Sequence, residues 1–241
     1  KQVDLVMLTS EAAKSRLECK NEPVVTGLPV RGAMLSADRA ACRKKLGIPE
    51  NRLVILSMGG SLGADAINHA MTELITAEKD NQQLYFIHAM GQYGLAMEED
   101  LKKNGVDPET QENLDLREYI HDMDVCMPAA DLLICRSGAS SLYEIRALGK
   151  ASILIPSPNV AENHQYHNAM ELVEHKAACM IEEKDLTGTA LHSLVEELAA
   201  APERLREMEE NARKMAILNS ADLIVDNMMQ LLPKDATEEN A

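Results

Sequence analysis

The chain has few aromatic residues and little basic charge. Among 241 residues it has no tryptophan, one phenylalanine and five tyrosines, so aliphatic side chains and 14 methionines must fill its core. Lysine and arginine number 24 against 39 acidic residues, a formal net charge of −15, which is opposite to the usual balance of a nucleic-acid-binding domain. The basic run Arg39 with Arg43-Lys44-Lys45 is interpreted as a solvent-facing helix surface, with contact to a lipid surface as the alternative.

Long apolar runs and paired cysteine motifs are also missing. No run approaches the roughly 18 apolar residues of a transmembrane helix, and the first residues have no signal-peptide pattern. The five cysteines are scattered and form no CxxC pair. This argues against a zinc site or a disulfide framework and favours a reducing cytoplasm.

Short apolar segments alternate with helical patterns along most of the chain. The alternation predicts an α/β fold, with a Rossmann-like parallel sheet covered by helices on both faces. The predicted strands cover residues 5–8, 24–25, 53–57, 84–88, 116–119, 132–135, 152–155 and 178–181. Ser36 is predicted to cap a helix that ends at Gly47, Thr187 to open a second helix, and Pro202 to be the first residue of a third.

Two strand-to-helix turns are rich in glycine and serine. After residues 53–57 comes Gly59-Gly60-Ser61-Leu62-Gly63, and after residues 132–135 comes Ser137-Gly138-Ala139-Ser140-Ser141. Such turns expose backbone N–H groups, and the helix dipole adds positive potential there. Two of them in one parallel sheet suggest a site for a nucleotide diphosphate. The first turn matches neither GxGxxG nor a P-loop, and alone it could be a tight turn in which Ser61 caps the helix.

Three further side chains extend this predicted site. Glu144 lies in the second turn of the helix after Gly138, where its carboxylate could accept hydrogen bonds from both ribose hydroxyls; the alternative is a surface glutamate favoured by the helix dipole. Arg136 could pair with phosphate or with a neighbouring acid. Gln165 follows a proline-containing loop, and its amide can both donate to and accept from sugar hydroxyls. His164 and His167 have no third ligand in view, so no metal site is predicted.

Several motifs together resemble one known family. They are Leu28-Pro29-Val30-Arg31, the glycine turn at 59–63, Tyr119-Ile120-His121-Asp122-Met123, the run from Cys135 to Glu144, and His164-Gln165-Tyr166-His167-Asn168-Ala169. Their order and spacing resemble the MurG family, the peptidoglycan N-acetylglucosaminyltransferases, over nearly the whole chain. The resemblance implies the C-terminal, donor-binding half of a GT-B glycosyltransferase.

The start of the chain shapes the expected domain organisation. Residues 3–8 and the helix after them have no sheet partner before them, so we expect residues 1–22 to be a remnant of an N-terminal acceptor domain; an edge unit of the main sheet is the alternative. Residues 23–35 would form an interdomain connector. The UDP-sugar donor-binding domain would then cover residues 36–232, with a polar tail at 233–241.

The resemblance also implies how UDP-N-acetylglucosamine would bind. Arg31 and Ser61 would contact the diphosphate region, Ile120 would meet uracil through its backbone, Glu144 would hold the ribose hydroxyls, and Gln165 would contact the N-acetylglucosamine. The residues expected to line the diphosphate and ribose are Ala139, Ser140, Ser141 and Leu142, and those expected to shape the supporting turns are Gly59, Gly60, Gly63 and Gly138.

The implied reaction is an inverting transfer. The 4-hydroxyl of muramoyl-pentapeptide pyrophosphoryl-undecaprenol attacks the anomeric carbon of UDP-N-acetylglucosamine, and UDP leaves. Arg31 and the helix N-termini can stabilise the leaving diphosphate, so no cofactor or divalent metal is expected. In this family the general base and the acceptor surface belong to the N-terminal domain. We therefore expect no catalytic residue in this chain, no activity of the chain alone, and a peripheral place for the whole enzyme at the cytoplasmic face of the membrane.

Two other functions remain open at this point. One is a separate UDP-sugar-binding subunit that needs a membrane partner. The other is a GT-B glycolipid glycosyltransferase, such as one that acts on diacylglycerol. A reading frame that extends upstream of Lys1 would argue against the separate subunit. Residues that choose the acceptor would separate the glycolipid enzyme from the peptidoglycan enzyme, and the expected acceptor surface lies in the other domain.

Overall fold

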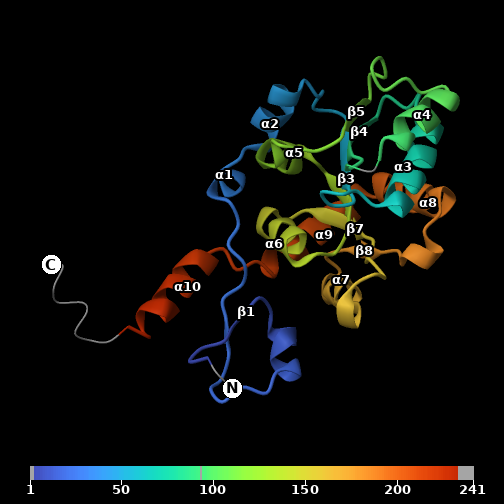
Figure 1. Ribbon diagram of the computed structural model, residues 1–241. Helices are drawn as coiled ribbons and strands as arrows, with labels where there is room; N and C mark the ends of the chain where they lie inside the picture. Colours follow the sequence, from blue (N-terminus) through green and yellow to red (C-terminus); the bar gives the residue numbers. More distant parts are fainter. Residues whose placement is uncertain (1–2, 93, 233–241) are drawn as a thin grey trace. The chain divides into compact units, whose positions relative to one another are not determined.

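The computed structural model describes residues 3–92 and 94–232 (Figure 1). The chain divides into two compact units. The larger unit is Arg31–Met215, and the smaller unit is formed by the described residues of Lys1–Val30 and Ala216–Ala241. All residues of the predicted site lie in the larger unit.

The larger unit is built on a six-stranded sheet in the order β5-β4-β3-β6-β7-β8, in which all neighbouring strands are parallel. The strands are β3 (Leu53–Met58), β4 (Leu84–Ala89), β5 (Leu114–Arg117), β6 (Leu132–Cys135), β7 (Ala151–Leu154) and β8 (Cys179–Met180). The central strands are almost entirely buried and mostly apolar, with one buried serine each in β3 and β7, as expected when helices cover both faces. The predicted fold class, a Rossmann-like parallel sheet, is confirmed.

Helices pack on both faces of this sheet. Figure 1 shows α3, α4 and α8 on one side of β3 and β4, and α2 and α5 on the other. The helices of this unit are α1 (Gly32–Leu35), α2 (Arg39–Leu46), α3 (Asp65–Ala77), α4 (Ala96–Lys103), α5 (Met123–Ala129), α6 (Ala139–Leu148), α7 (His164–Glu174), α8 (Gly188–Ala199) and α9 (Pro202–Lys214), with short 3-10 turns at η2 (Ala161–Asn163) and η3 (Glu183–Asp185). The main core joins strand residues such as Phe86 to helix residues such as Ile67 and Leu191, all fully buried. Burying each such side chain contributes about 1.5–3 kcal/mol.

The direction of the strand order reverses between β3 and β6. From β3 the chain builds outward through β4 to β5, then returns to β6 on the other side of β3 and builds outward again to β8. Met58 and Cys135, the last residues of β3 and β6, are paired across the ladder. In open α/β sheets, ligands bind beyond the carboxyl ends of the strands at such a reversal. The two predicted turns therefore begin side by side at the expected place.

One predicted helix start is wrong. Helix α2 begins at Arg39, and the side chain of Asp38 caps it by accepting a hydrogen bond from the Ala41 N–H at 2.8 Å. Ser36 instead ends the short helix α1. The predicted end is confirmed, because Gly47 closes α2 in the left-handed conformation with φ 70°. Serine and aspartate are both good N-caps, and local sequence could not choose between them.

Other helix and strand boundaries follow the sequence more closely. Thr187 caps α8 by accepting a hydrogen bond from the Ala190 N–H at 3.1 Å, and Pro202 is the first residue of α9, both as predicted. Every predicted strand overlaps an observed one. Strand β5 is the least well placed, because it covers Leu114–Arg117 where residues 116–119 were predicted.

The basic run on α2 is not simply a solvated surface. Arg43 is buried, with only 4% of its surface exposed, and its guanidinium is ion-paired with Asp131. It also donates to the carbonyl oxygens of Ala129 and Glu50 at 3.0 and 2.9 Å. Arg39 is ion-paired with the same carboxylate. The predicted solvent-facing role is therefore wrong for Arg43, whose ion pair with Asp131 links α2 to the residue just before β6.

The smaller unit contains a two-stranded parallel sheet, in which β1 (Met7–Leu8) pairs with β2 (Val24–Val25), a 3-10 helix η1 (Glu11–Arg16), and helix α10 (Ser220–Met229). The two strands thus form a sheet of their own and are not an edge of the main sheet. Residues 216–232 belong to this unit, whereas we predicted them from the sequence to be part of the donor-binding domain. The polar tail predicted at 233–241 lies outside the described residues. Every described helix is too short or too polar to cross a membrane.

Candidate functional site

The turn after β3 is a glycine-lined loop at the carboxyl edge of the sheet. It runs from Gly59 to Gly63, and α3 begins only at Asp65, with Ala64 at the N-cap position. Gly60 and Gly63 have φ values of 98° and 86°, a backbone conformation that side chains other than glycine rarely adopt. Ser61 is exposed and is not the helix cap, so the alternative interpretation of this serine is wrong.

The turn after β6 leads directly into α6, with Gly138 at the N-cap position. A Cβ atom on Gly138 would meet no atom within 4 Å, so the backbone at the helix start faces open space. Ser137 is buried behind it and donates from its hydroxyl to the carbonyl oxygen of Gln165 at 2.8 Å. The amide of Asn168 donates in return to the Ser137 carbonyl at 3.2 Å. Helix α7 is thereby held against this second turn.

A first cavity, of about 400 Å³, lies between the two turns. It brings together six of the predicted site residues and five others. The predicted residues are Arg31, Gly60, Ser61, Ile120, Ser141 and Glu144, and the others are Met58, Ala89, Tyr119, His121 and Met123. The sequence assigned no role to His121, although its neighbours in the Tyr-Ile-His motif could have indicated that this segment enters the site.

The first cavity has a polar and an apolar part. In the polar part, the Arg31 guanidinium lies 3.5 Å from a carboxylate oxygen of Glu144. Glu144 lies in the second turn of α6, and its carboxylate faces the cavity that Ser61 also lines. Tyr119 and Ile120 form the apolar part, with the Tyr119 ring 4.9 Å from the ring of His121. A flat, partly apolar base and a sugar with two hydroxyls match these two parts.

A second cavity, of about 380 Å³, lies on the other side of the first turn. Its lining residues are Gly59, Gly63, Ala64, Asp65, Ala66, Arg136, Ser157, Asn159, Gln165 and Glu183. The side-chain oxygen of Gln165 accepts a hydrogen bond from the Ser157 N–H at 3.0 Å. Its amide nitrogen is therefore the group that could donate to a ligand in this cavity.

The guanidinium of Arg136, which lines this cavity, binds other groups of the protein. It is ion-paired with Glu183 and donates to the carbonyl oxygens of Ile155 and Pro156 at 3.2 Å each. Of the two roles left open for Arg136, the structure shows the pairing with a neighbouring acid. No motif in the sequence pointed to Glu183, which lies 47 positions away in the 3-10 turn η3.

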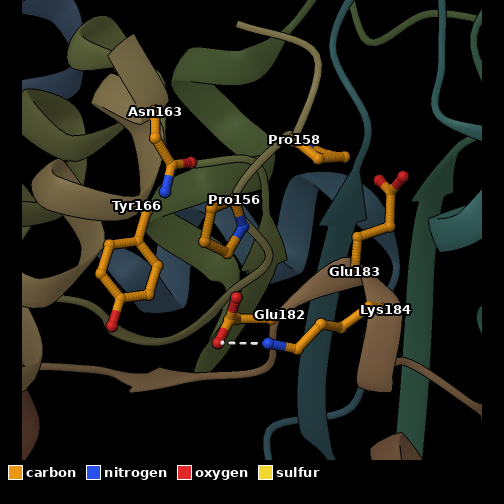
Figure 2. Close-up of a pocket in the computed structure, with 7 residues that line it drawn as sticks. All are labelled: Pro156, Pro158, Asn163, Tyr166, Glu182, Glu183 and Lys184. Atoms are coloured by element: carbon orange, nitrogen blue, oxygen red, sulfur yellow. Dashed lines mark hydrogen bonds and ion pairs between the residues drawn. The ribbon is translucent and has the colours of Figure 1, made fainter.

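Figure 2 shows a third cavity, of about 290 Å³, that shares Glu183 with the second. Its other lining residues are Pro156, Pro158, Asn163, Tyr166, Glu182 and Lys184. The Lys184 ammonium pairs with Glu182 at 3.2 Å. Asn163, which lines this cavity, and the preceding Glu162 have φ values of 50° and 54°, a conformation that stores strain in residues with a side chain.

The remaining predicted residues lie near these cavities but do not line them. Gly138, Ala139 and Ser140 form the start of α6, where their backbone N–H groups point out of the helix end. Leu142 is only 2% exposed, so its side chain belongs to the core and only its backbone could approach a ligand.

Burial, assisted by the charge of Glu144, raises the pKa of the Cys135 thiol at the end of β6 to about 12, which makes this thiol a poor nucleophile.

Possible metal ligands lie elsewhere. Among the described residues, one group of potential ligands comes together: Glu78, His192 and Glu196. Glu78 follows the C-terminal end of α3, at the amino edge of the sheet, and so lies far from the cavities. His164, on the cavity side, is exposed and its ring nitrogen Nδ1 contacts the Ala161 carbonyl at 2.9 Å.

The sheet order and the paired turns place the protein in a structural class. Solved structures with this architecture include MurG of Acinetobacter baumannii, with a TM-score of 0.70 and 28% identity over 88% of this chain and 58% of that one. The S. aureus MnaA–UDP co-structure, with a TM-score of 0.69 and 15% identity over 95% of this chain and 62% of that one, shares the fold. The class is the Rossmann-like domain of GT-B glycosyltransferases.

The chain belongs to the glycosyltransferase family 28 C-terminal domain family, whose model matches residues 54–226. Its curated relatives include proteins of Acetivibrio thermocellus and Desulforamulus reducens, 38% and 35% identical over 98% and 97% of the chain. Both are named UDP-N-acetylglucosamine–N-acetylmuramyl-(pentapeptide) pyrophosphoryl-undecaprenol N-acetylglucosamine transferase. The chain spans 63% of the length of each of these relatives.

Proposed function

We propose that this chain is the donor-binding half of an enzyme that transfers N-acetylglucosamine from UDP-N-acetylglucosamine to muramoyl-pentapeptide pyrophosphoryl-undecaprenol, converting lipid I into lipid II. The observation that carries the proposal is the first cavity, which is lined both by Ser61 of the turn after β3 and by Glu144 of α6. The particular reaction is the one for which the relatives are named.

The cavities support one arrangement of the donor. Uracil would lie against Tyr119 and Ile120, where a backbone N–H and C=O can pair with its edge. The ribose hydroxyls would reach Glu144, and the diphosphate would lie between the two turns, near Ser61 and Arg31. The N-acetylglucosamine would then extend toward the second cavity and the amide of Gln165.

The chemistry assigned to this chain is stabilisation of the leaving group. As the bond to the anomeric carbon breaks, negative charge grows on the UDP oxygen, and the helix N-termini and Arg31 oppose it. None of the described cavity residues is assigned as the base that deprotonates the acceptor hydroxyl. We place that base, the acceptor surface and the contact with the membrane in an N-terminal acceptor domain, and we propose no metal or other cofactor for the transfer.

The domain organisation is part of the same proposal. Residues 1–22 would belong to the acceptor domain and residues 23–35 to the connector, while the donor-binding domain would extend from residue 36 to residue 232. The larger compact unit, Arg31–Met215, contains every proposed donor contact.

Calorimetric titration with UDP-N-acetylglucosamine, UDP-glucose and UDP tests the proposal. We expect all three to bind, and the first to bind more tightly than UDP-glucose. The variant Gln165→Glu keeps the oxygen that accepts from Ser157 but loses the N–H donors. This variant should reduce the difference in affinity between UDP-N-acetylglucosamine and UDP-glucose. The change in its affinity for UDP, which has no sugar, measures the effect of the added negative charge.

The absence of UDP binding at millimolar concentration would contradict the proposal. A second measurement tests whether the catalytic base lies in another domain. The 241-residue chain should show no transfer to the muramoyl lipid, and turnover by this chain alone would refute the placement of the base in another domain.

A further inference from the structure

A buried chain of hydrogen bonds runs beneath the first turn. His88 on β4 is completely buried, with its Nδ1 atom 2.5 Å from the Ser57 hydroxyl on β3. Its Nε2 atom lies 3.1 Å from the amide oxygen of Asn68 on α3. The Asn68 amide nitrogen in turn donates to the backbone carbonyl of Met90 at 2.8 Å. Three side chains from three elements thus form one chain of hydrogen bonds, of which Asn68 contacts the Met90 peptide group.

The direction of every hydrogen bond in this chain is fixed. The Met90 carbonyl can only accept, so Asn68 must turn its NH₂ group toward Met90 and its oxygen toward His88. That oxygen also can only accept, so the Nε2 atom of His88 must carry the proton. The Nδ1 atom then accepts from the Ser57 hydroxyl. The neutral Nε2–H tautomer is the form of His88 that satisfies all of these partners.

The peptide held by this chain supports the first turn. A Cβ atom on Gly63 would lie 2.2 Å from the Met90 carbonyl oxygen, and a Cβ atom on Gly91 would lie 2.1 Å from the Gly63 nitrogen. The Gln92 N–H also donates to the Ser61 carbonyl at 3.4 Å. The turn therefore rests directly on the backbone at Met90 and Gly91, without side chains between them. A displacement of Met90 would displace the turn.

We infer that His88 is a positioning residue for the donor: acting through Asn68 and the Met90 carbonyl, it sets the place of the Gly59–Gly63 turn and so the affinity for the diphosphate. This inference rests on the proposed function in one respect, namely that the turn binds a diphosphate. His88 itself touches no ligand in this arrangement, since it is completely buried and does not line any of the three cavities described above.

An ordinary core role for these side chains makes a different prediction. If the network only satisfied buried polar groups, its loss would lower stability without changing the affinity of the molecules that remain folded. Asn113 provides the matched control. It is 1% exposed, and its amide nitrogen likewise donates to backbone carbonyls, those of Glu78 at 3.2 Å and Asn81 at 3.1 Å. These groups lie at the amino edge of the sheet, away from the turn.

The decisive variant is Asn68→Asp, compared with Asn113→Asp. A carboxylate cannot donate to Met90, so at pH 8 we expect UDP to bind about tenfold more weakly to Asn68→Asp than to the wild type. When the new carboxyl group is protonated it can donate to Met90 and still accept from His88. The affinity ratio of variant to wild type should therefore return toward one by pH 5.5. In the wild type, burial lowers the pKa of His88, the titratable side chain in contact with Asn68, to about 3, so His88 is neutral at both pH values. In Asn68→Asp the new carboxylate favours a proton on the adjacent imidazole, so the change in affinity with pH reports on the protonation of the carboxyl–imidazole pair.

Two further measurements keep the test informative. Hydrogen exchange should become faster at residues 59–63 and 90–92 in Asn68→Asp, and should stay unchanged there in Asn113→Asp. If Asn68→Asp does not fold, the pair His88→Gln and His88→Met replaces it. The glutamine amide can donate to Asn68 as Nε2 does and should restore most of the affinity that methionine loses.

The outcomes separate this inference from the proposed function. If the wild type binds no UDP, the proposed function fails, whereas the exchange rates still report on the turn. If the wild type binds UDP but Asn68→Asp binds equally well at pH 8, the inference is overturned and the proposed function stands. An affinity loss of the same size in Asn113→Asp would also overturn the inference, because it would show a general effect of a weakened core.

Discussion

Replacing Glu144 with alanine should weaken the binding of every UDP compound. The carboxylate faces the first cavity, and in the proposed complex it accepts hydrogen bonds from two ribose hydroxyls. A hydrogen bond to a charged group contributes about 1.5–3 kcal/mol, and part of this is recovered because water replaces the lost acceptor. Loss of Glu144 also releases Arg31, whose side chain is 56% exposed, so that its ion pair contributes less than about 1 kcal/mol. A net loss of about 1–3 kcal/mol raises Kd by roughly 5- to 150-fold.

Calorimetry with UDP and 2′-deoxy-UDP isolates the ribose contact. Removal of the 2′-hydroxyl should reduce affinity for the wild type but have a much smaller effect on Glu144→Ala, because the partner of that hydroxyl is already absent. Glu203→Ala is the matched control, since Glu203 is an exposed glutamate at the start of α9 that lines none of the cavities described above. Unchanged UDP affinity in Glu144→Ala, or an equal penalty for the missing hydroxyl in both proteins, would refute the assignment of this residue to the ribose.

Three other predictions concern the scaffold. Gly63→Ala should reduce both Tm and UDP affinity more than Gly105→Ala. Both glycines have positive φ, but of the two only Gly63 has no room for a Cβ atom. Equal effects of the two variants in melting and titration experiments would contradict this prediction. Asp131→Asn should lower the free energy of unfolding in urea by about 3–5 kcal/mol, because it leaves the buried guanidinium of Arg43 without its counter-ion, and a loss below about 1 kcal/mol would count against that ion pair. Burial lowers the pKa of His88 from 6.5 to about 3, so the unfolded chain binds a proton that the folded chain does not, and stability should fall as pH drops from about 6.5 toward 3. His88→Gln should flatten that decline by up to about 1.4 kcal/mol per pH unit, and identical slopes in urea titrations would exclude the histidine as its cause.

Most of the fold could be predicted because most of its strands are short runs of mainly apolar residues. Strand β6 has four buried residues in a row, and both of its ends were predicted correctly. Strand β5 was predicted two residues too late because it lies at the edge of the sheet, where only β4 pairs with it. Its residues alternate between apolar and charged, as at Asp115 and Arg117, and the more apolar pair Tyr119 and Ile120 lies in the cavity wall. The predicted strand therefore shares residues 116 and 117 with β5 and extends to Tyr119, which lines the cavity.

The candidate site was predictable where it depended on the backbone. Two turns that follow neighbouring parallel strands must share one edge of the sheet, so the meeting of Ser61 and Glu144 follows from the topology. Side-chain partners from distant segments were not predictable. The pairing of Arg136 with Glu183 depends on where the chain goes after β8, and the burial of Arg43 depends on Asp131, 88 positions further along.

The contact between Arg31 and Glu144 has a consequence for the speed of ligand capture. If the first cavity binds UDP-N-acetylglucosamine as proposed, the ligand meets two opposite charges that line the cavity and largely cancel, on a chain whose formal charge is −15. An approaching dianion therefore meets net repulsion at long range and attraction only within the reach of the backbone N–H groups. Added salt should then accelerate association, in contrast to enzymes whose basic surfaces draw nucleotides in and which lose that advantage as ionic strength rises.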